Sequence, residues 1–62
     1  MYEIDGVLYL DGSSFARLIG RHPSRVGQLR NDGRCRGWAI KHKGRWFYRL
    51  DAALAFAREY GR

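Results

Sequence analysis

The sequence predicts a small α+β domain in the order β-hairpin, helix, helix, β-hairpin, helix. Three patterns carry this prediction: an Asp-Gly pair between β-prone residues, two short helical patterns separated by a glycine, and an aromatic-rich segment that ends at an aspartate. We expect one domain over residues 1–62, because a chain this short buries only about 60% of its unfolded surface. That size excludes a Rossmann domain or a TIM barrel and favours a binding module.

The N-terminal residues 2–9 are predicted to form the first hairpin. Asp5-Gly6 is a strong two-residue turn signal, and the residues on both sides of it are β-prone. A two-residue loop pairs Ile4 with Val7 and places Tyr2 and Tyr9 on the face of that pair.

Two short helices joined by a tight turn are predicted next. The first spans roughly residues 12–19, with Asp11 as its N-cap and Gly20 as a left-handed stop. Pro23 suits the first position of the second helix, which Asn31-Asp32-Gly33 closes. Helix, three-residue turn and helix is the spacing expected of a helix-turn-helix.

Residues 38–49 predict a second hairpin, for which two loops compete. A two-residue Lys43-Gly44 loop would place core residues on the face of Arg45 and Arg49. We favour a three-residue loop, His42-Lys43-Gly44, which pairs Lys41 with Arg45. This register groups four side chains on one face: Trp38, Ile40, Trp46 and Tyr48. It leaves Phe47 on the basic face, where it would contact the first hairpin or a nucleotide, so Phe47 is the aromatic that we would test as a base stacker.

A final helix is predicted after Leu50, with Asp51 as its cap and Gly61 at its end. Its apolar side is expected to contain five residues: Ala53, Leu54, Phe56, Ala57 and Tyr60.

The basic charge is concentrated in the middle of the chain. The net charge is +6, yet residues 17–49 contain ten basic residues and one acid, Asp32. Ten of the twelve cations are arginine, whose planar fork suits phosphate and guanine edges. A polyanion is therefore the expected partner, and no membrane partner is expected, because no apolar run approaches the roughly 18 residues of a membrane span.

Metal binding and catalysis find little support in the sequence. Cys35, His22 and His42 are the only soft or imidazole ligands, and they show no paired spacing, so no metal or cofactor is expected. The protein is not expected to be an enzyme; the alternative is a small RNA-cleaving protein with His22 or His42 as acid or base. A single cysteine favours a reducing compartment, so a cytoplasmic protein is expected.

The second helix is the best candidate for base recognition. With Val26 on the inner side, the helical period puts Ser24, Gly27, Gln28 and Asn31 on the outer side, with Arg25 at its flank. Gln28 and Asn31 could bond adenine edges, and Arg25 guanine or phosphate. Ser24, at the helix start, could contact phosphate.

The order of elements resembles the excisionase-like, MerR-related winged helix-turn-helix family, roughly over residues 9–60. The matching residues are Tyr9-Leu10, Ala16, Leu18, Gly20, Pro23-Ser24, Val26, Leu29, Asp32-Gly33, Gly44-Arg45-Trp46, Leu54 and Phe56. His22, Gly27 and the N-terminal hairpin depart from the family pattern.

The resemblance implies a sequence-specific double-stranded DNA-binding protein whose second hairpin is a wing. Ser24, Arg25, Gln28 and Asn31 would enter a major groove, and the wing would approach a minor groove or the backbone. The residues expected at the wing and backbone are Arg21, Lys41, His42, Lys43 and Arg45. A chain this short resembles a phage or mobile-element excisionase, with a tyrosine integrase and neighbouring copies on DNA as partners, or a small phage transcriptional regulator. The resemblance implies a nucleoid-associated protein, or one in the host cytoplasm if it is phage-encoded. The alternatives are a terminase small-subunit DNA-recognition domain and a small basic RNA-binding or RNA-cleaving protein.

Overall fold

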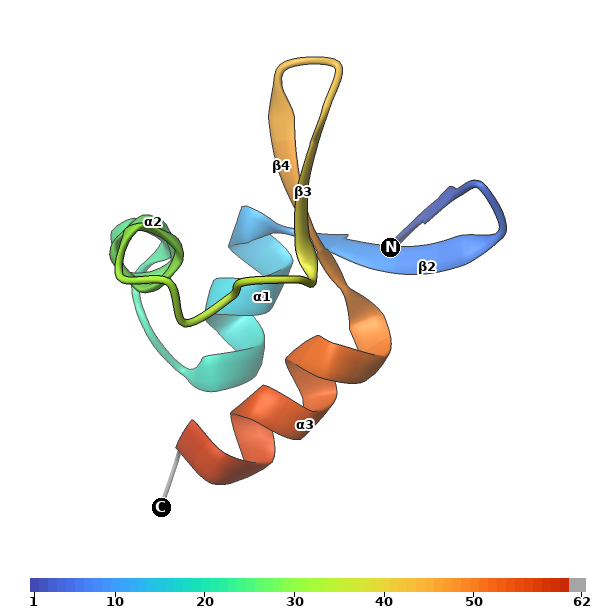
Figure 1. Ribbon diagram of the computed structural model, residues 1–62. Helices are drawn as coiled ribbons and strands as arrows, with labels where there is room; N and C mark the ends of the chain where they lie inside the picture. Colours follow the sequence, from blue (N-terminus) through green and yellow to red (C-terminus); the bar gives the residue numbers. More distant parts are fainter. Residues whose placement is uncertain (61–62) are drawn as a thin grey trace.

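The computed structural model describes residues 1–60, which form three helices and one four-stranded antiparallel sheet (Figure 1). The elements are β1 (Tyr2–Ile4), β2 (Val7–Asp11), α1 (Gly12–Ile19), α2 (Pro23–Asn31), β3 (Ala39–His42), β4 (Arg45–Arg49) and α3 (Leu50–Tyr60). The strand order is β1-β2-β4-β3. The predicted small α+β class and order of elements are confirmed, whereas the predicted helix end at Gly61 lies outside the described residues.

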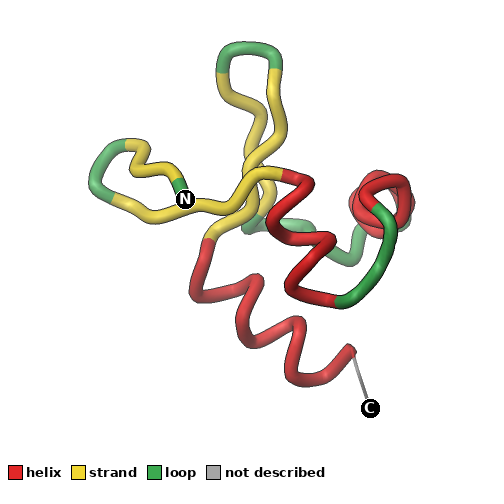
Figure 2. Tube along the Cα trace, turned by 180° about the vertical axis from the view of Figure 1, so that it is seen from behind, coloured by secondary structure: helices red, strands yellow, loops and turns green. Residues whose placement is uncertain are grey.

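The two hairpins project in different directions from the helices, and α1 packs between α2 and α3 (Figures 1 and 2). Both hairpins belong to the same sheet because β2 pairs with β4, with Leu10 opposite Tyr48. The core lies where the helices meet the inner half of β4. Its buried members are Phe15, Ala16, Ile19, Val26, Leu29, Cys35, Tyr48 and Ala53.

The predicted geometry of the first hairpin is confirmed. Ile4 pairs with Val7 and Tyr2 with Tyr9, as a two-residue loop requires. Asp5 and Gly6 both have positive φ, 53° and 79°, which is the type I′ turn whose twist matches the strands that it joins.

The ends of α1 match their capping signals, whereas the N-cap of α2 is a residue for which no cap was predicted. The Ser14 backbone N–H donates to the Asp11 carboxylate at 2.8 Å, and Gly20 ends α1 in the left-handed region at φ 70°. The Ser24 backbone N–H donates to His22 Nδ1 at 3.1 Å, so His22 is the N-cap of α2. Imidazole nitrogen thus satisfies a free N–H group at the helix start, as the side-chain oxygens of common cap residues do.

The preferred register of the second hairpin was wrong. His42 pairs with Arg45 and Ile40 with Phe47, so the loop contains two residues, Lys43-Gly44, with φ values of 51° and 79°. This is again a type I′ turn, and the left-handed conformation falls on Lys43 as well as on the glycine.

The reason for the error is that both faces of β4 have apolar partners. Tyr48 is buried among the helices, while Phe47 is 5% exposed and packs edge-on against Tyr2 of the first hairpin, with ring centroids 4.9 Å apart. Phe47 is therefore a contact with the first hairpin and is not available for base stacking. The face of β4 that was predicted to carry the basic residues also makes apolar contacts, because β2 pairs with β4 and Tyr2 packs on Phe47.

The four side chains predicted to share one face of the second hairpin do not all lie on one face. Trp46 lies on the face of Tyr48 but is 36% exposed, whereas Ile40 lies on the opposite face with Phe47. Trp38 precedes β3, so strand alternation does not set its direction, and it packs against Phe15 with centroids 5.6 Å apart.

The last helix begins two residues earlier than an N-cap at Asp51 predicts. It starts at Leu50, directly after β4, so Asp51 lies in its first turn and is not the N-cap. Asp51 accepts from Arg49 Nε at 2.7 Å and still faces the positive end of the helix. Ala53 is fully buried, and Phe56, Ala57 and Tyr60 pack on the core, whereas Leu54 is exposed.

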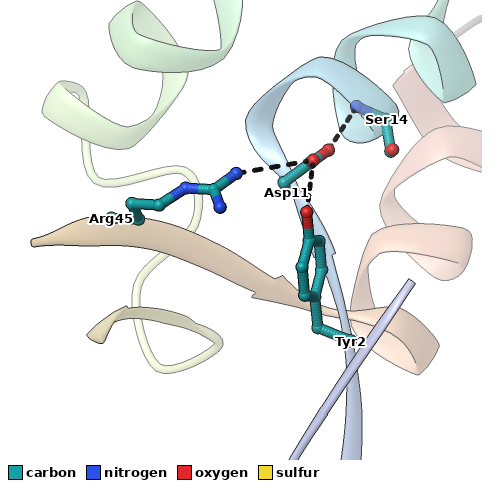
Figure 3. A network of polar contacts seen from close by, with 4 residues as sticks. All are labelled: Tyr2, Asp11, Ser14 and Arg45. Atoms are coloured by element: carbon teal, nitrogen blue, oxygen red, sulfur yellow. Dashed lines mark hydrogen bonds and ion pairs between the residues drawn. The ribbon is translucent and has the colours of Figure 1, made fainter. Parts of the chain in front are cut away.

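Asp11 connects the two hairpins to α1 (Figure 3). Its carboxylate accepts from the Tyr2 hydroxyl at 3.3 Å and lies 3.7 Å from the Arg45 guanidinium, besides capping α1. The Ser14 backbone N–H, followed by the Ser14 side chain, lowers the pKa of Asp11 below its ordinary value of 3.8. One side chain thus supports the helix start and the contact between the two hairpins.

Asp11→Ala is expected to lower the free energy of unfolding by about 1 kcal/mol, because the cap is lost. Asp11→Asn keeps an acceptor for Ser14 and should retain most of the stability, since an exposed ion pair contributes about 0–1 kcal/mol. The pKa is lower in the folded state, so the contribution is present above the ordinary pKa of 3.8 and is lost as pH falls through the folded value. Thermal melts between pH 2 and pH 7 measure both effects; equal melting of Asp11→Ala and wild type would contradict the prediction.

Candidate nucleic-acid interface

The outer face of α2 is exposed, as its helical period predicts. Ser24, Arg25, Gln28 and Asn31 are all exposed, while Val26 and Leu29 are buried beneath them. Gly27 differs from its prediction: it is half-buried and lines a hollow between α2 and β4. A helix with one buried side and one polar side can present the polar side to a partner without losing its packing.

Arg25 is held in place by residues on both sides. Its Nε donates to the Tyr60 hydroxyl oxygen at 2.9 Å, and its Nη1 donates to Gln28 Oε1 at 3.1 Å. The hydrogen bond from Arg25 lowers the pKa of the Tyr60 phenol and raises that of the guanidinium. Arg21 also lies near this cluster, 5.4 Å from the Tyr60 ring centroid. The last turn of α3 therefore supports the outer face of α2.

Ser24 contacts the start of its own helix. Its hydroxyl lies 3.0 Å from His22 Nδ1, which also accepts from the Ser24 backbone N–H. Since Nδ1 accepts from the backbone, the proton of the neutral ring is on Nε2. The side chains of both residues are exposed at the first turn of α2, where the helix dipole favours an anion.

The cations of the β3–β4 hairpin are distributed over two sides and the tip. Lys41 lies on the side of Trp46, at 6.0 Å from that ring, whereas Arg45 extends to Asp11 and lies over the Tyr2 and Phe47 rings. His42 is half-buried beside Phe47, with ring centroids 6.3 Å apart. Lys43 is exposed at the tip. Lys43 is thus the cation that extends farthest from the helices, while Arg45 already has a carboxylate partner.

Arg30 and Trp46 connect α2 to this hairpin. The Arg30 guanidinium lies 4.5 Å from the Trp46 ring centroid, within the range of a cation–π contact, and donates to the Tyr48 hydroxyl at 2.9 Å. Hollows lie on both sides of the pair, and each is lined by residues of α2 and of the hairpin. The contact joins the hairpin to α2, in addition to the pairing of β4 with β2 that holds the hairpin in the sheet.

Both elements of this region are basic, and two carboxylates lie at their edges: Asp11 beside Arg45, and Asp32 at the C-cap of α2. Neither α2, residues 23–31, nor the hairpin, residues 39–49, contains an aspartate or a glutamate. Together these segments contain six lysine and arginine residues: Arg25, Arg30, Lys41, Lys43, Arg45 and Arg49.

Comparisons with known proteins do not assign the chain to a family. No family model, curated protein or solved structure matches it. Over residues 1–60, no three His, Cys, Asp or Glu side chains are grouped in a way that could hold a metal ion. Over the same residues, no helix combines the length and the apolar character needed to cross a membrane.

Sequence reasoning missed three members of this region: Arg30, Trp46 and Tyr60. The helical period places Arg30 four residues after Val26, toward the inner side, which is a signal that it has a partner within the fold. Trp46 was assigned to the core because it shares a face of β4 with Tyr48, but it lies nearer the hairpin tip and is 36% exposed. No pattern in the sequence indicates the contact between Tyr60 and Arg25, because 35 positions separate them.

Proposed function

We propose that this protein is a sequence-specific double-stranded DNA-binding protein of the winged helix-turn-helix type. The observation that carries the proposal is the exposed polar face of α2 beside a basic hairpin, with no carboxylate on either element. In the proposed complex, α2 enters the major groove, which is wide enough for a helix, and the β3–β4 hairpin is the wing.

The roles of the individual residues follow from their surroundings. Arg25 and Gln28 are exposed and held in a defined geometry, which suits contacts to base edges. Lys43 at the hairpin tip suits a phosphate contact, and Ser24 and Arg21 at the start of α2 suit the backbone beside the major groove. Arg45 contributes as a phosphate ligand only if it leaves Asp11.

The finer role that we propose is that of an excisionase-like recombination directionality factor or a small phage transcriptional regulator. The support for this role is the resemblance of residues 9–60 to the excisionase-like family. A tyrosine integrase and neighbouring copies on DNA are the corresponding proposed partners. Binding to one isolated site without any effect on recombination would favour repression over excision.

The experiment that tests DNA recognition is repeated selection on a random duplex pool at about 150 mM salt, where nonspecific phosphate attraction is weakened. We expect one short enriched motif. A flat pool would refute sequence-specific recognition by α2. A single-stranded RNA pool selected in parallel is the matched control, because an RNA-binding protein would prefer it to duplex DNA.

Variants of α2 and of the hairpin tip are expected to behave differently. Gln28→Ala should reduce discrimination at the base pair that it contacts by about 1–3 kcal/mol. Lys43→Ala should weaken binding to all sequences alike and lower the salt slope by about 1, since one phosphate contact is lost. Fluorescence anisotropy at several salt concentrations measures both quantities. Equal losses on cognate and random duplexes for both variants would contradict the assignment of α2.

A further inference from the structure

Three residues from two helices form a chain of hydrogen bonds along the exposed side of α2. The Tyr60 hydroxyl accepts from Arg25 Nε at 2.9 Å, and Arg25 Nη1 donates to Gln28 Oε1 at 3.1 Å. A guanidinium carries donors and no acceptor, so the amide of Gln28 must turn its oxygen toward Arg25. One of the two lone pairs of Gln28 Oε1 is therefore already engaged before any base is bound, and that oxygen is turned toward Arg25.

Donors outnumber acceptors among the groups that these side chains still offer. Gln28 keeps both amide N–H groups, and Arg25 keeps N–H groups on its two terminal nitrogens. A glutamine that binds adenine needs its oxygen for the adenine amino group and its N–H for N7. Guanine presents two acceptors, O6 and N7, at the same edge, and thymine presents only one.

We propose that Tyr60, Arg25 and Gln28 act as a unit that recognises guanine in the major groove, with Tyr60 as the positioning residue. This proposal rests on the proposed function of α2. Tyr60 itself contacts no base: it occupies Arg25 Nε, so that Arg25 approaches the guanine with its terminal nitrogens. The adenine contact that the sequence predicts for Gln28 is replaced by a guanine contact.

The support for Tyr60 is rigid enough for this role. Its ring stacks on Phe56, with centroids 5.3 Å apart and an interplanar angle of 23°, and Tyr60 packs against the core cluster. Arg21 and Arg34 lie over the same ring at 5.4 and 5.9 Å. Because Arg25 and Gln28 are ordered before binding, less side-chain entropy is lost on contact with DNA.

The test compares duplex selection by wild type, Tyr60→Phe and Gln28→Ala. We expect a guanine in the wild-type motif at the position whose preference Gln28→Ala removes. Replacing that guanine by 7-deazaguanine, which lacks the N7 acceptor, should weaken binding by about tenfold. Tyr60→Phe keeps the ring stack but removes the acceptor for Arg25, so the preference for guanine over adenine should fall by about tenfold.

The controls separate base recognition from structural damage. Tyr9→Phe removes a hydroxyl from β2, away from α2, and should leave the motif unchanged. A purely structural role of Tyr60 would lower the affinity for all sequences equally. Adenine at the Gln28-dependent position, or an unchanged motif in Tyr60→Phe, overturns this proposal while the proposed function stands. A flat wild-type pool overturns both.

Discussion

Phe15→Ala is expected to unfold most of the protein or to leave it barely stable at 25 °C. Phe15 is fully buried, and its ring contacts Tyr48, Trp38 and Phe56 at centroid distances of 5.0, 5.6 and 5.8 Å. Removing a buried phenylalanine costs about 3–5 kcal/mol. The total stability typical of this length is only about 3–9 kcal/mol. One side chain therefore accounts for a large part of it.

Urea denaturation followed by circular dichroism measures this loss, and the same helix offers a matched control. Leu18 is 39% exposed on α1 and lies outside the buried core cluster, so Leu18→Ala removes less buried area than Phe15→Ala, and alanine is the better helix former. We expect a shift of less than about 1 kcal/mol for this control. Similar midpoints for Phe15→Ala and Leu18→Ala would show that Phe15 does not hold the helices to the sheet.

Arg30→Ala is expected to cause the second large effect, by separating the β3–β4 hairpin from α2. The Tyr48 hydroxyl loses the donor that lies 2.9 Å away, and Tyr48 is fully buried. Burial raises the pKa of Tyr48, so the phenol stays neutral, and an unpaired buried hydroxyl costs about 1–3 kcal/mol. Loss of the contact with Trp46 adds about 0.5–1 kcal/mol.

A double-mutant cycle with Tyr48→Phe measures the coupling. Tyr48→Phe removes the hydroxyl, so Arg30→Ala in that background no longer leaves an unpaired polar group. We expect Arg30→Ala to cost at least about 1 kcal/mol less in the Tyr48→Phe protein than in wild type. Additive losses would show that the hydrogen bond contributes nothing, and the Trp46 contact alone would then position the hairpin.

The elements that could be predicted from the sequence are those whose geometry depends on near neighbours in the chain. The Asp5-Gly6 turn requires two residues that tolerate positive φ, and it sets the register of the first hairpin. Asp11 and Gly20 bound α1 through groups within a few residues of each other. The exposure of Arg25 and Gln28 follows in the same way from the helical period.

The register of the second hairpin could not be predicted from neighbouring residues alone. Its turn signal allows two loop lengths, and the three-residue loop was favoured because it keeps core residues off the face of Arg45 and Arg49. In the structure, pairing of β2 with β4 brings Tyr2 onto Phe47 and buries Phe47 on the face that was expected to be basic. A local pattern contains no information about which strand will cover which face.

In the candidate site, too, one part follows from the local sequence and another from the packing of distant elements. Helical periodicity determined that the polar side of α2 faces outward, because each residue's direction depends only on its place in the turn. The tertiary structure decided that Tyr60 holds Arg25 and that Arg30 lies on Trp46. These contacts join residues far apart in the chain, so they exist only after the helices and the sheet have packed together.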